Sequence, residues 1–274
     1  MSKKVFLTFA NTGFMKPDRI INEAKEFGVF DEVRAMNEHD ISDFISKHSD
    51  FIKLNPYGYG RFIWKPKVIF DTLNSLSDND ILVYSDSGCS INNNGLERFN
   101  EYIDLLETND MITFSTNDKY KANFYVKADA VMSYCPEMND SNMNSCYAGL
   151  MLIKKTDASL HLIEDWLQLC ETYNFIDNSK STLHEEKPWF VGQDTDNGLF
   201  NLCLLKHKIS HSIYPDEVNI YVGDSQYSHV YPGEVGDWTS LSKTPFHYTR
   251  NTPKLRKNIQ PHKPTFIYSF LNKK

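Results

Sequence analysis

An acidic side chain stands where an apolar run ends, in the segment 84–89 (YSDSGC). The preceding residues 81–84 (ILVY) have the character of a short buried strand. In an open parallel sheet, ligands bind beyond the carboxyl ends of the strands. Asp86 at such an end can hold a hard cation that also bridges two phosphates, and Gly88 allows the backbone to approach a ligand closely. The alternative is a turn aspartate that only ends the strand, and this segment alone leaves both interpretations open.

A cationic segment containing two glycines precedes this acid by about twenty residues. Residues 58–67 read GYGRFIWKPK and lead into a predicted helix. Arg61 and Lys65 are well suited to a pyrophosphate, because charged donors and the N-terminus of a helix both favour anions. The alternative is an exposed loop loosened by its glycines.

Two further groups of polar residues lie later in the chain. Residues 193–197 (QDTDN) open a predicted helix, where Asp194 and Asp196 can either cap the helix or face a ligand. His247 and Arg250 belong to the segment FHYTR. A lone histidine is more often structural than a metal ligand, so both roles stay open for His247.

Strand-like and helix-like segments alternate along the chain, which predicts an α/β fold with a mostly parallel central sheet flanked by helices. The predicted strands are 5–10, 32–36, 81–84, 111–114 and 148–153. The predicted helices are 17–27, 66–76, 96–106, 160–170 and one that begins near 194–197. Residues 129–144, rich in Asn, Met and Ser, are expected to form a loop. Without an internal repeat or a linker, we expect a single compact domain over residues 1–274.

The composition limits the possible partners. A net charge of −7 over 274 residues lacks the basic footprint of a nucleic-acid-binding protein. No segment reaches the roughly 18 apolar residues of a membrane span, and the start MSKK leads into a short strand and not into a signal peptide. The five cysteines have no metal-site or disulfide spacing. We therefore expect a cytoplasmic protein.

The segments GYGRFIWKP and DILVYSDSGC together resemble GT-A nucleotide-diphospho-sugar transferases, in particular a branch found in bacteria and large DNA viruses. The resemblance continues in residues 125–129 and 147–152 and in Trp166, and it covers roughly residues 3–210. It implies a Rossmann-like sheet that binds a nucleotide sugar, with residues 1–115 as the donor-binding half. Residues 116–274 would then form the acceptor-side half and the C-terminal tail. If the chain belongs to a viral member of this branch, its expected location is the host cytoplasm.

The resemblance also implies roles for single residues. Donor binding is expected of Thr8, Phe9, Ala10, Asn11, Arg61, Lys65, Tyr84, Ser85, Asp86, Gly88, Lys127 and Arg250. Acceptor-side positions are Tyr147, Ala148, Gly149 and Trp189, and the acid that faces the acceptor hydroxyl is Asp196, with Asp194 as the alternative. Mn²⁺ or Mg²⁺ is expected on Asp86 and His247. The family's second acid is absent, because Tyr84 and Gly88 occupy its two possible positions. Arg61, Lys65 and Lys127 could then neutralise part of the phosphate charge.

The implied activity is the transfer of a sugar from a nucleotide sugar, with UDP as the expected nucleotide, to a saccharide or glycoprotein acceptor. A non-catalytic nucleotide-sugar-binding module is the alternative from another class. A sugar nucleotidyltransferase is disfavoured, because residues 11–17 (NTGFMKP) are not a glycine-rich basic loop after the first strand.

Overall fold

The computed structural model describes residues 2–13, 16–116, 120–213 and 243–247. Its centre is a six-stranded sheet in the order β2-β1-β3-β6-β5-β7. The strands are β1 (Lys4–Phe9), β2 (Glu32–Met36), β3 (Ile81–Ser85), β5 (Met111–Ser115), β6 (Cys146–Lys154) and β7 (Ser210–Ile213). Only β6 runs antiparallel to its neighbours among these six. The predicted α/β fold with a mostly parallel sheet is confirmed.

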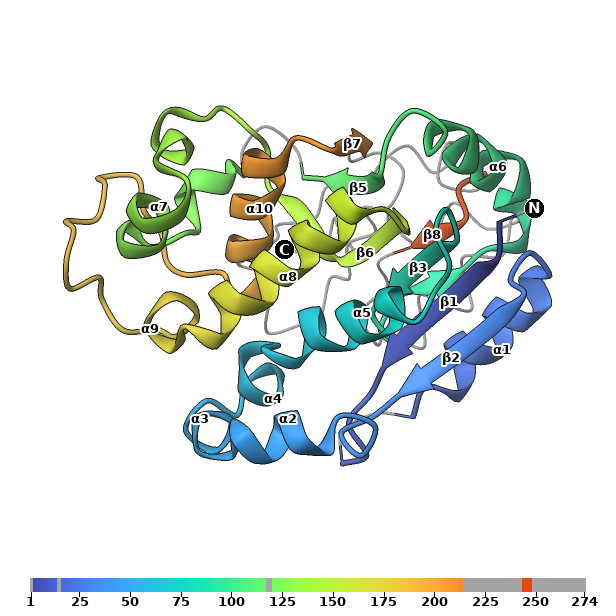
Figure 1. Ribbon diagram of the computed structural model, residues 1–274, viewed down its shortest axis with the longest axis horizontal. Coiled ribbons are helices and arrows are strands. Elements are labelled where there is room, and N and C mark those ends of the chain that lie inside the picture. The colour runs from blue at the N-terminus through green and yellow to red at the C-terminus, as the bar shows by residue number, and fades with distance from the viewer. Residues whose placement is uncertain (1, 14–15, 117–119, 214–242, 248–274) are drawn as a thin grey trace, which may run out of the picture.

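Helices cover both faces of the sheet (Figure 1). Helices α1 (Asp18–Phe27) and α6 (Leu96–Leu105) pack on one face, and α5 (Trp64–Asn74), α8 (Asp157–Glu171) and α10 (Thr195–His207) pack on the other. Successive side chains along a strand point to opposite faces of the sheet, so Phe6 and Leu7 of β1 pack in different apolar clusters. Because both apolar clusters share this sheet, the described residues form one α/β domain.

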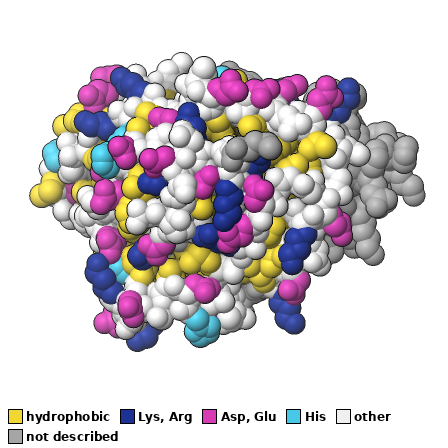
Figure 2. Space-filling model, turned by 45° about the vertical axis from the view of Figure 1, so that its right-hand side comes forward, with side chains coloured by type: hydrophobic (Ala, Val, Ile, Leu, Met, Phe, Trp, Pro, Cys, Tyr) yellow, Lys and Arg dark blue, Asp and Glu magenta, His cyan; other side chains and the backbone are white. Residues whose placement is uncertain are grey.

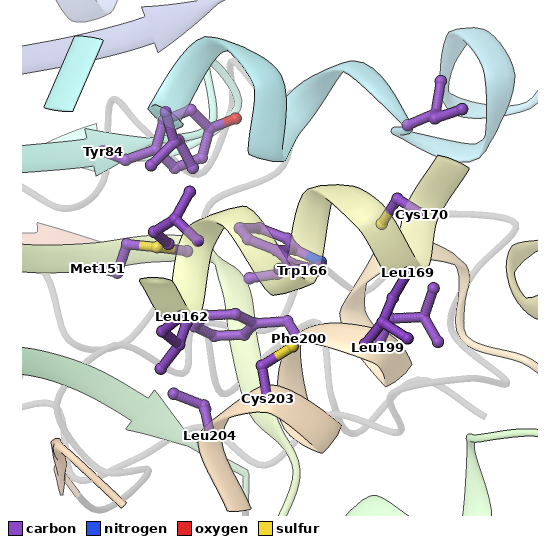
Figure 3. Packing of buried hydrophobic residues seen from close by; sticks show 14 of the residues in the cluster. Tyr84, Met151, Leu162, Trp166, Leu169, Cys170, Leu199, Phe200, Cys203 and Leu204 are labelled. Atoms are coloured by element: carbon purple, nitrogen blue, oxygen red, sulfur yellow. The ribbon is translucent and has the colours of Figure 1, made fainter. Parts of the chain in front are cut away.

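The packing of α8 against α10 is the centre of the larger cluster (Figure 3). The rings of Trp166 and Phe200 lie 4.7 Å apart, centroid to centroid. Trp166 is fully buried, and its indole N–H donates a hydrogen bond of 2.9 Å to the backbone carbonyl of Asp196. The core thus fixes the first turn of α10, where Asp196 lies two residues after Asp194.

Several short elements were not predicted. Helices α2 (Ser42–Lys47), α3 (Ser49–Leu54), α4 (Gly58–Arg61) and α9 (Tyr173–Ile176), and the 3-10 turns η1 (Asn93–Gly95) and η2 (Ala122–Phe124), are too short to show a clear period. Strands β4 (Ser90–Ile91) and β8 (Phe246–His247) form a separate two-stranded sheet.

The prediction of a loop over residues 129–144 was wrong for much of this segment. Helix α7 (Ala128–Tyr134) and the 3-10 helix η3 (Pro136–Asp140) occupy it. Ala130 and Val131 of α7 are buried in the core, so tertiary packing overrides the weak helix propensity of the Asn- and Ser-rich composition.

Acidic and basic side chains are mixed over the face shown in Figure 2, with hydrophobic patches between them. This face therefore carries no broad region of a single charge. Within the described ranges, none of the helices has both the length and the apolar character needed to cross a lipid bilayer.

Candidate active site

The carboxyl ends of β1 and β3 form the edge at which the predicted donor-binding segments 8–11 and 84–88 meet. These strands are parallel neighbours, with Leu7 opposite Tyr84, and β2 pairs with the other side of β1. The chain therefore proceeds from β1 toward one edge of the sheet for β2 and toward the other edge for β3. Ligands of open α/β sheets bind at such a reversal of the strand order. Residues 8–11 and 84–88 both lie at this point, so the structure brings these two predicted segments together.

A left-handed turn over residues 58–62 lies between α3 and α5. All five residues have φ values between 54° and 84°. For Tyr59, Arg61 and Phe62 this conformation costs about 1–2 kcal/mol each, because the Cβ atom crowds the backbone. A Cβ on Gly60 would lie 2.7 Å from Cγ1 of Ile52, so this position is restricted to glycine by space as well as by φ. Backbone strain of this kind is often found at functional sites.

Lys65 follows the left-handed turn and lies in the first turn of α5, with 3% of its surface exposed. Its Nζ is 3.2 Å from Oδ1 of Asp86 and 3.5 Å from Oδ2 of Asp196. The ammonium also lies 4.9 Å from the centre of the Phe62 ring. Burial opposes the charged form, but the carboxylates of Asp196 and Asp86 outweigh it and raise the pKa of Lys65. A fixed positive charge therefore lies between two acids from distant parts of the sequence.

Asp86 is held by Tyr84 as well as by Lys65. The Tyr84 hydroxyl donates a hydrogen bond of 2.8 Å to Oδ1 of Asp86. The backbone N–H of Asp86 donates to the carbonyl of Gly149 in β6, at 2.8 Å. The Asp86 side chain keeps 24% of its surface exposed, so its carboxylate is the most exposed of the three charged groups in the cluster.

Asp196 is the buried acid of the cluster, with 2% of its surface exposed. Thr195 before it has a φ of 44°, and its hydroxyl donates to Oδ1 of Asp196 at 3.1 Å. Among the described residues, Oδ2 of Asp196 receives no hydrogen bond, and Lys65 is its ion-pair partner. Burial raises the pKa of Asp196 to about 7, although the Lys65 ammonium acts in the opposite direction. A carboxyl group with this pKa can take up or release a proton near neutral pH.

Asp194 occupies the N-cap position of α10 without capping the helix through its side chain. Instead, its Oδ2 accepts a hydrogen bond of 2.9 Å from the amide of Asn197. The Oδ1 atom of Asn197 in turn accepts the backbone N–H of Ala148 in β6, at 2.7 Å. The alternative explanation of Asp194 as a simple N-cap therefore does not describe its contacts.

Two of the predicted phosphate-binding cations lie in structural contacts. Arg61 is buried and donates to the backbone carbonyls of Ile176 and Gln193, at 2.6 and 3.2 Å. The Lys127 ammonium is fully buried and lies 2.6 Å from Oδ1 of Asp177. These contacts direct both cations toward the segment between α9 and α10. Their donor-binding roles stay predictions, and Lys65 is the predicted cation that the structure places beside Asp86.

The predicted acceptor-side residues do not form one group. Ala148 and Gly149 contact Asn197 and Asp86, as described above, and so belong to the cluster. Tyr147 packs in the apolar cluster of α1 and α6, on the opposite face of the sheet. Trp189 is 40% exposed and lies in the segment before α10.

The metal prediction rests on Asp86 and His247, and Arg250 lies outside the described residues. His247 is buried in β8 beside Ser90 of β4, and its Nε2 is 3.1 Å from the Thr244 hydroxyl. In the described part of the chain, no group of three or more His, Cys, Asp or Glu side chains could hold a metal ion. Asp86 can offer a carboxylate oxygen, so a cation here would take its other ligands from a bound diphosphate or from water.

Sequence reasoning did not assign a role to Gln193, which connects several of these residues. Its side-chain oxygen accepts the backbone N–H of Lys127 at 3.0 Å, and its side-chain nitrogen donates to the carbonyl of Thr195 at 2.8 Å. Its position directly before the acidic pair was the available signal. Phe62 was also missed, because only the left-handed turn brings its ring against Lys65.

Comparison with known proteins gives structural matches only. No family model matches the chain, and a search of curated proteins gives no match. The chain is similar to mouse xyloside xylosyltransferase 1, with a TM-score of 0.46, 12% identity, and coverage of 90% of this chain and 97% of that one. It is similar to a glycosyltransferase involved in glycosylation of the major capsid of PBCV-1, with a TM-score of 0.46, 10% identity, and coverage of 93% and 97%.

A third match is 4-diphosphocytidyl-2C-methyl-D-erythritol synthase from Anaerococcus prevotii, with a TM-score of 0.40, 13% identity, and coverage of 84% of this chain and 96% of that one. All three matches have TM-scores below 0.5 and identities of 10–13%.

Proposed function

We propose that this protein transfers a sugar from a nucleotide-sugar donor to a saccharide or glycoprotein acceptor. The observation that supports this most directly is the buried Lys65 ammonium between Asp86 and Asp196, at the carboxyl end of β3. Glycosyl transfer places negative charge on the departing diphosphate and positive charge on the sugar ring. A site that holds a fixed cation and two carboxylates side by side can stabilise both charges without rearrangement.

In this proposal the nucleotide lies at the carboxyl ends of β1 and β3, along residues 8–11. Lys65 and Asp86 would lie beside the diphosphate and the sugar of the bound donor. Asp196, with Asp194 beside it, takes the proton of the acceptor hydroxyl, for which a pKa of about 7 is well matched. The donor that we propose is a UDP-sugar, and the location that we propose is the cytoplasm.

We propose Mn²⁺ or Mg²⁺ as the cofactor, with Asp86 as its protein ligand. When bound, the cation would neutralise charge on the diphosphate. The ammonium of Lys65 already supplies one positive charge at this position, so the protein's own residues provide part of that neutralisation.

A donor assay tests this proposal. The protein is incubated with UDP-glucose, UDP-galactose, UDP-xylose and UDP-N-acetylglucosamine, with and without Mn²⁺, and the release of UDP is measured. A thermal-shift screen of the same compounds measures binding, because ligands of the native state raise the melting temperature. We expect slow release of UDP from at least one donor. Binding without turnover, even when acceptors are added, would instead identify a non-catalytic binding module.

A further inference from the structure

A pocket of about 180 Å³ lies beside Asp194, at the edge of the sheet where the parallel strands have their carboxyl ends. It is lined by Thr116, Tyr120, Tyr125, Ser145, Val191, Gly192, Gln193 and Asp194. Thr116 follows the end of β5, and Ser145 precedes the start of β6, which runs in the opposite direction. Both positions therefore lie at the carboxyl edge of the parallel strands. None of the residues that line the pocket belongs to the ends of β1 or β3.

The distance between the two sites suits a group transfer. Strands β3 and β5 are both neighbours of β6, so their ends are two strand spacings apart, or about 10 Å. That is room for one sugar ring between a diphosphate at the end of β3 and a second molecule at the end of β5. Asp194 lies in the wall of the pocket, and Asp196, two residues later, contacts Lys65. Asp194 and Asp196 thus lie between the pocket and the site around Lys65.

The wall of the pocket combines aromatic and hydrogen-bonding groups. Tyr120 and Tyr125 provide ring surfaces, and Thr116, Ser145 and Asp194 provide hydroxyl and carboxylate groups. Several of these groups are fixed: the Thr116 hydroxyl donates to the carbonyl of Tyr120 at 3.1 Å, and the Ser145 hydroxyl accepts the amide of Asn201 at 3.3 Å. A sugar ring presents apolar C–H faces and a rim of hydroxyls, which fits a mostly apolar pocket with a few placed polar groups.

We infer that this pocket binds the saccharide that accepts the transferred sugar, an inference that rests on the proposed glycosyltransferase function. A hydroxyl oxygen of the bound saccharide forms a bond to the anomeric carbon of the donor sugar. The bond between that carbon and the diphosphate oxygen breaks, and the diphosphate leaves with the electron pair. The hydroxyl proton passes to a carboxylate of the Asp194–Asp196 cluster.

A bulky substitution at the mouth of the pocket tests this inference. Val191 lines the pocket and is 71% exposed, and its backbone N–H donates a hydrogen bond to the carbonyl of Phe124. Val191→Trp therefore adds volume to the pocket wall without disturbing the core. Leu183→Trp is the matched control, because Leu183 is 75% exposed in the same segment between α9 and α10 and does not line the pocket. Tyr120→Ala removes one ring of the wall as a second variant.

Three measurements are made on the full chain. They are UDP release without acceptor, transfer to p-nitrophenyl glycosides of glucose, galactose, xylose and mannose, and binding of the matching methyl glycosides by saturation-transfer NMR. For Val191→Trp and Tyr120→Ala we expect the acceptor KM to rise about tenfold or more, as for the loss of one or two good contacts, while UDP release stays unchanged. Leu183→Trp should behave like the unsubstituted protein in all three measurements.

The outcomes separate this inference from the proposed function. An unchanged acceptor KM in both pocket variants would overturn the inference. A loss of UDP release without acceptor in both variants would also overturn it, because it would place the nucleoside in the pocket. Methyl glycosides that bind the unsubstituted protein but not Val191→Trp would support a saccharide pocket even if no donor is hydrolysed. In that case the proposed transfer would fail while the pocket assignment stands. No binding of any methyl glycoside at millimolar concentration, together with no transfer, would overturn the assignment itself.

Discussion

The Nζ atom of Lys65 lies 3.5 Å from Oδ2 of Asp196, although the two residues are far apart in the sequence and come from different helices. Both side chains are buried, and Lys65 is shared with Asp86, which is part-exposed. Burying a charge is costly unless it is paired, so these side chains depend on one another. The pairing joins the predicted donor side of the site to the predicted acceptor side.

Replacing Lys65 by alanine should weaken donor binding and also destabilise the fold. The substitution leaves Asp196 buried without its ion-pair partner, which typically costs about 3–5 kcal/mol when one partner of a buried pair is removed. The free energy of unfolding is measured in urea, and the donor dissociation constant by calorimetry below the unfolding transition. The double variant Lys65→Met/Asp196→Asn should recover part of the stability but not the donor affinity.

Lys67→Ala is the matched control for this prediction. Lys67 lies two residues later on α5 and pairs with Asp71 at 2.7 Å, where both side chains are about one-third exposed. Such a pair contributes at most about 0.5 kcal/mol, and it lies outside the cluster. If Lys65→Ala leaves the donor dissociation constant unchanged, Lys65 has a structural role only.

Asp86→Asn should abolish transfer while the protein stays folded. The amide keeps the size of the carboxylate and can still accept the Tyr84 hydroxyl, but it loses the negative charge beside Lys65. We expect the rate to fall by about 100-fold or more, as for other removals of a preorganised charged group. Asp78→Asn, at an exposed turn, is the control and should change neither rate nor melting temperature. Near-normal turnover of Asp86→Asn with saturating Mn²⁺ would show that the assignment of Asp86 to the metal is wrong.

The raised pKa of Asp196 predicts a specific dependence of stability on pH. Since the folded-state pKa of about 7 lies above the unfolded value of 3.8, the folded protein binds the extra proton between these values. The stability from this group is fully present below pH 4 and is lost as the pH rises toward and through 7. The free energy of unfolding relative to Asp196→Asn should therefore fall by about 2–3 kcal/mol between pH 5 and pH 8.

Comparison with the variant is necessary, because other carboxyl groups act in the opposite direction. Hydrogen bonds from Arg34 and Lys3 lower the pKa of Glu32 to about 2, so acidification removes stability there. This contribution is the same in both proteins and cancels in the difference. A difference that is constant from pH 5 to pH 8 would show that Asp196 stays ionised throughout, with Lys65 as the dominant influence.

The regular part of the fold was predictable from the sequence. The apolar runs that became β1, β3, β5 and β6 are buried on both sides, and buried strands of a parallel sheet produce such runs. Helix α7 was not predictable in the same way, because its seven residues are too few for a period and its helical state depends on packing. The antiparallel direction of β6 could not be predicted from the sequence either, since antiparallel pairing changes the partners of a buried strand but not its composition.

The candidate site was predictable in its residue types but only partly in its contacts. Asp86, Lys65 and Asp196 were all expected, and the structure places them together. The pairing of Lys127 with Asp177 could not be predicted, because a contact across fifty positions of the sequence depends on the path of the chain. The left-handed turn was expected only as a flexible glycine-containing loop, whereas the structure shows a defined conformation.

Gly60→Ala should destabilise the protein and disturb the placement of Lys65. The new Cβ would lie 2.7 Å from Ile52 and would require a φ of 84°, which L-residues rarely adopt. We expect a loss of about 1–3 kcal/mol in the free energy of unfolding, together with weaker donor binding. Gly13→Ala is the control, because a Cβ there meets no atom of the described residues within 4 Å. Equal melting temperatures for the two variants would contradict a requirement for the left-handed turn.

Asp196→Ala should keep donor affinity but lose turnover, because a group that takes the acceptor proton acts mainly in the transition state. If either acid served only as a helix cap, its substitution would cost about 1 kcal/mol of stability with little kinetic effect. Asp157→Ala provides the comparison, since Asp157 is an exposed acid in the first turn of α8. Melting temperature, donor dissociation constant and transfer rate are measured for Asp196→Ala, Asp194→Ala and Asp157→Ala under the same conditions. A destabilised but fully active Asp196→Ala protein would contradict its catalytic role. Asp194, in the wall of the pocket, would then be the acid that takes the proton, and its alanine variant should lose transfer while UDP release without acceptor continues.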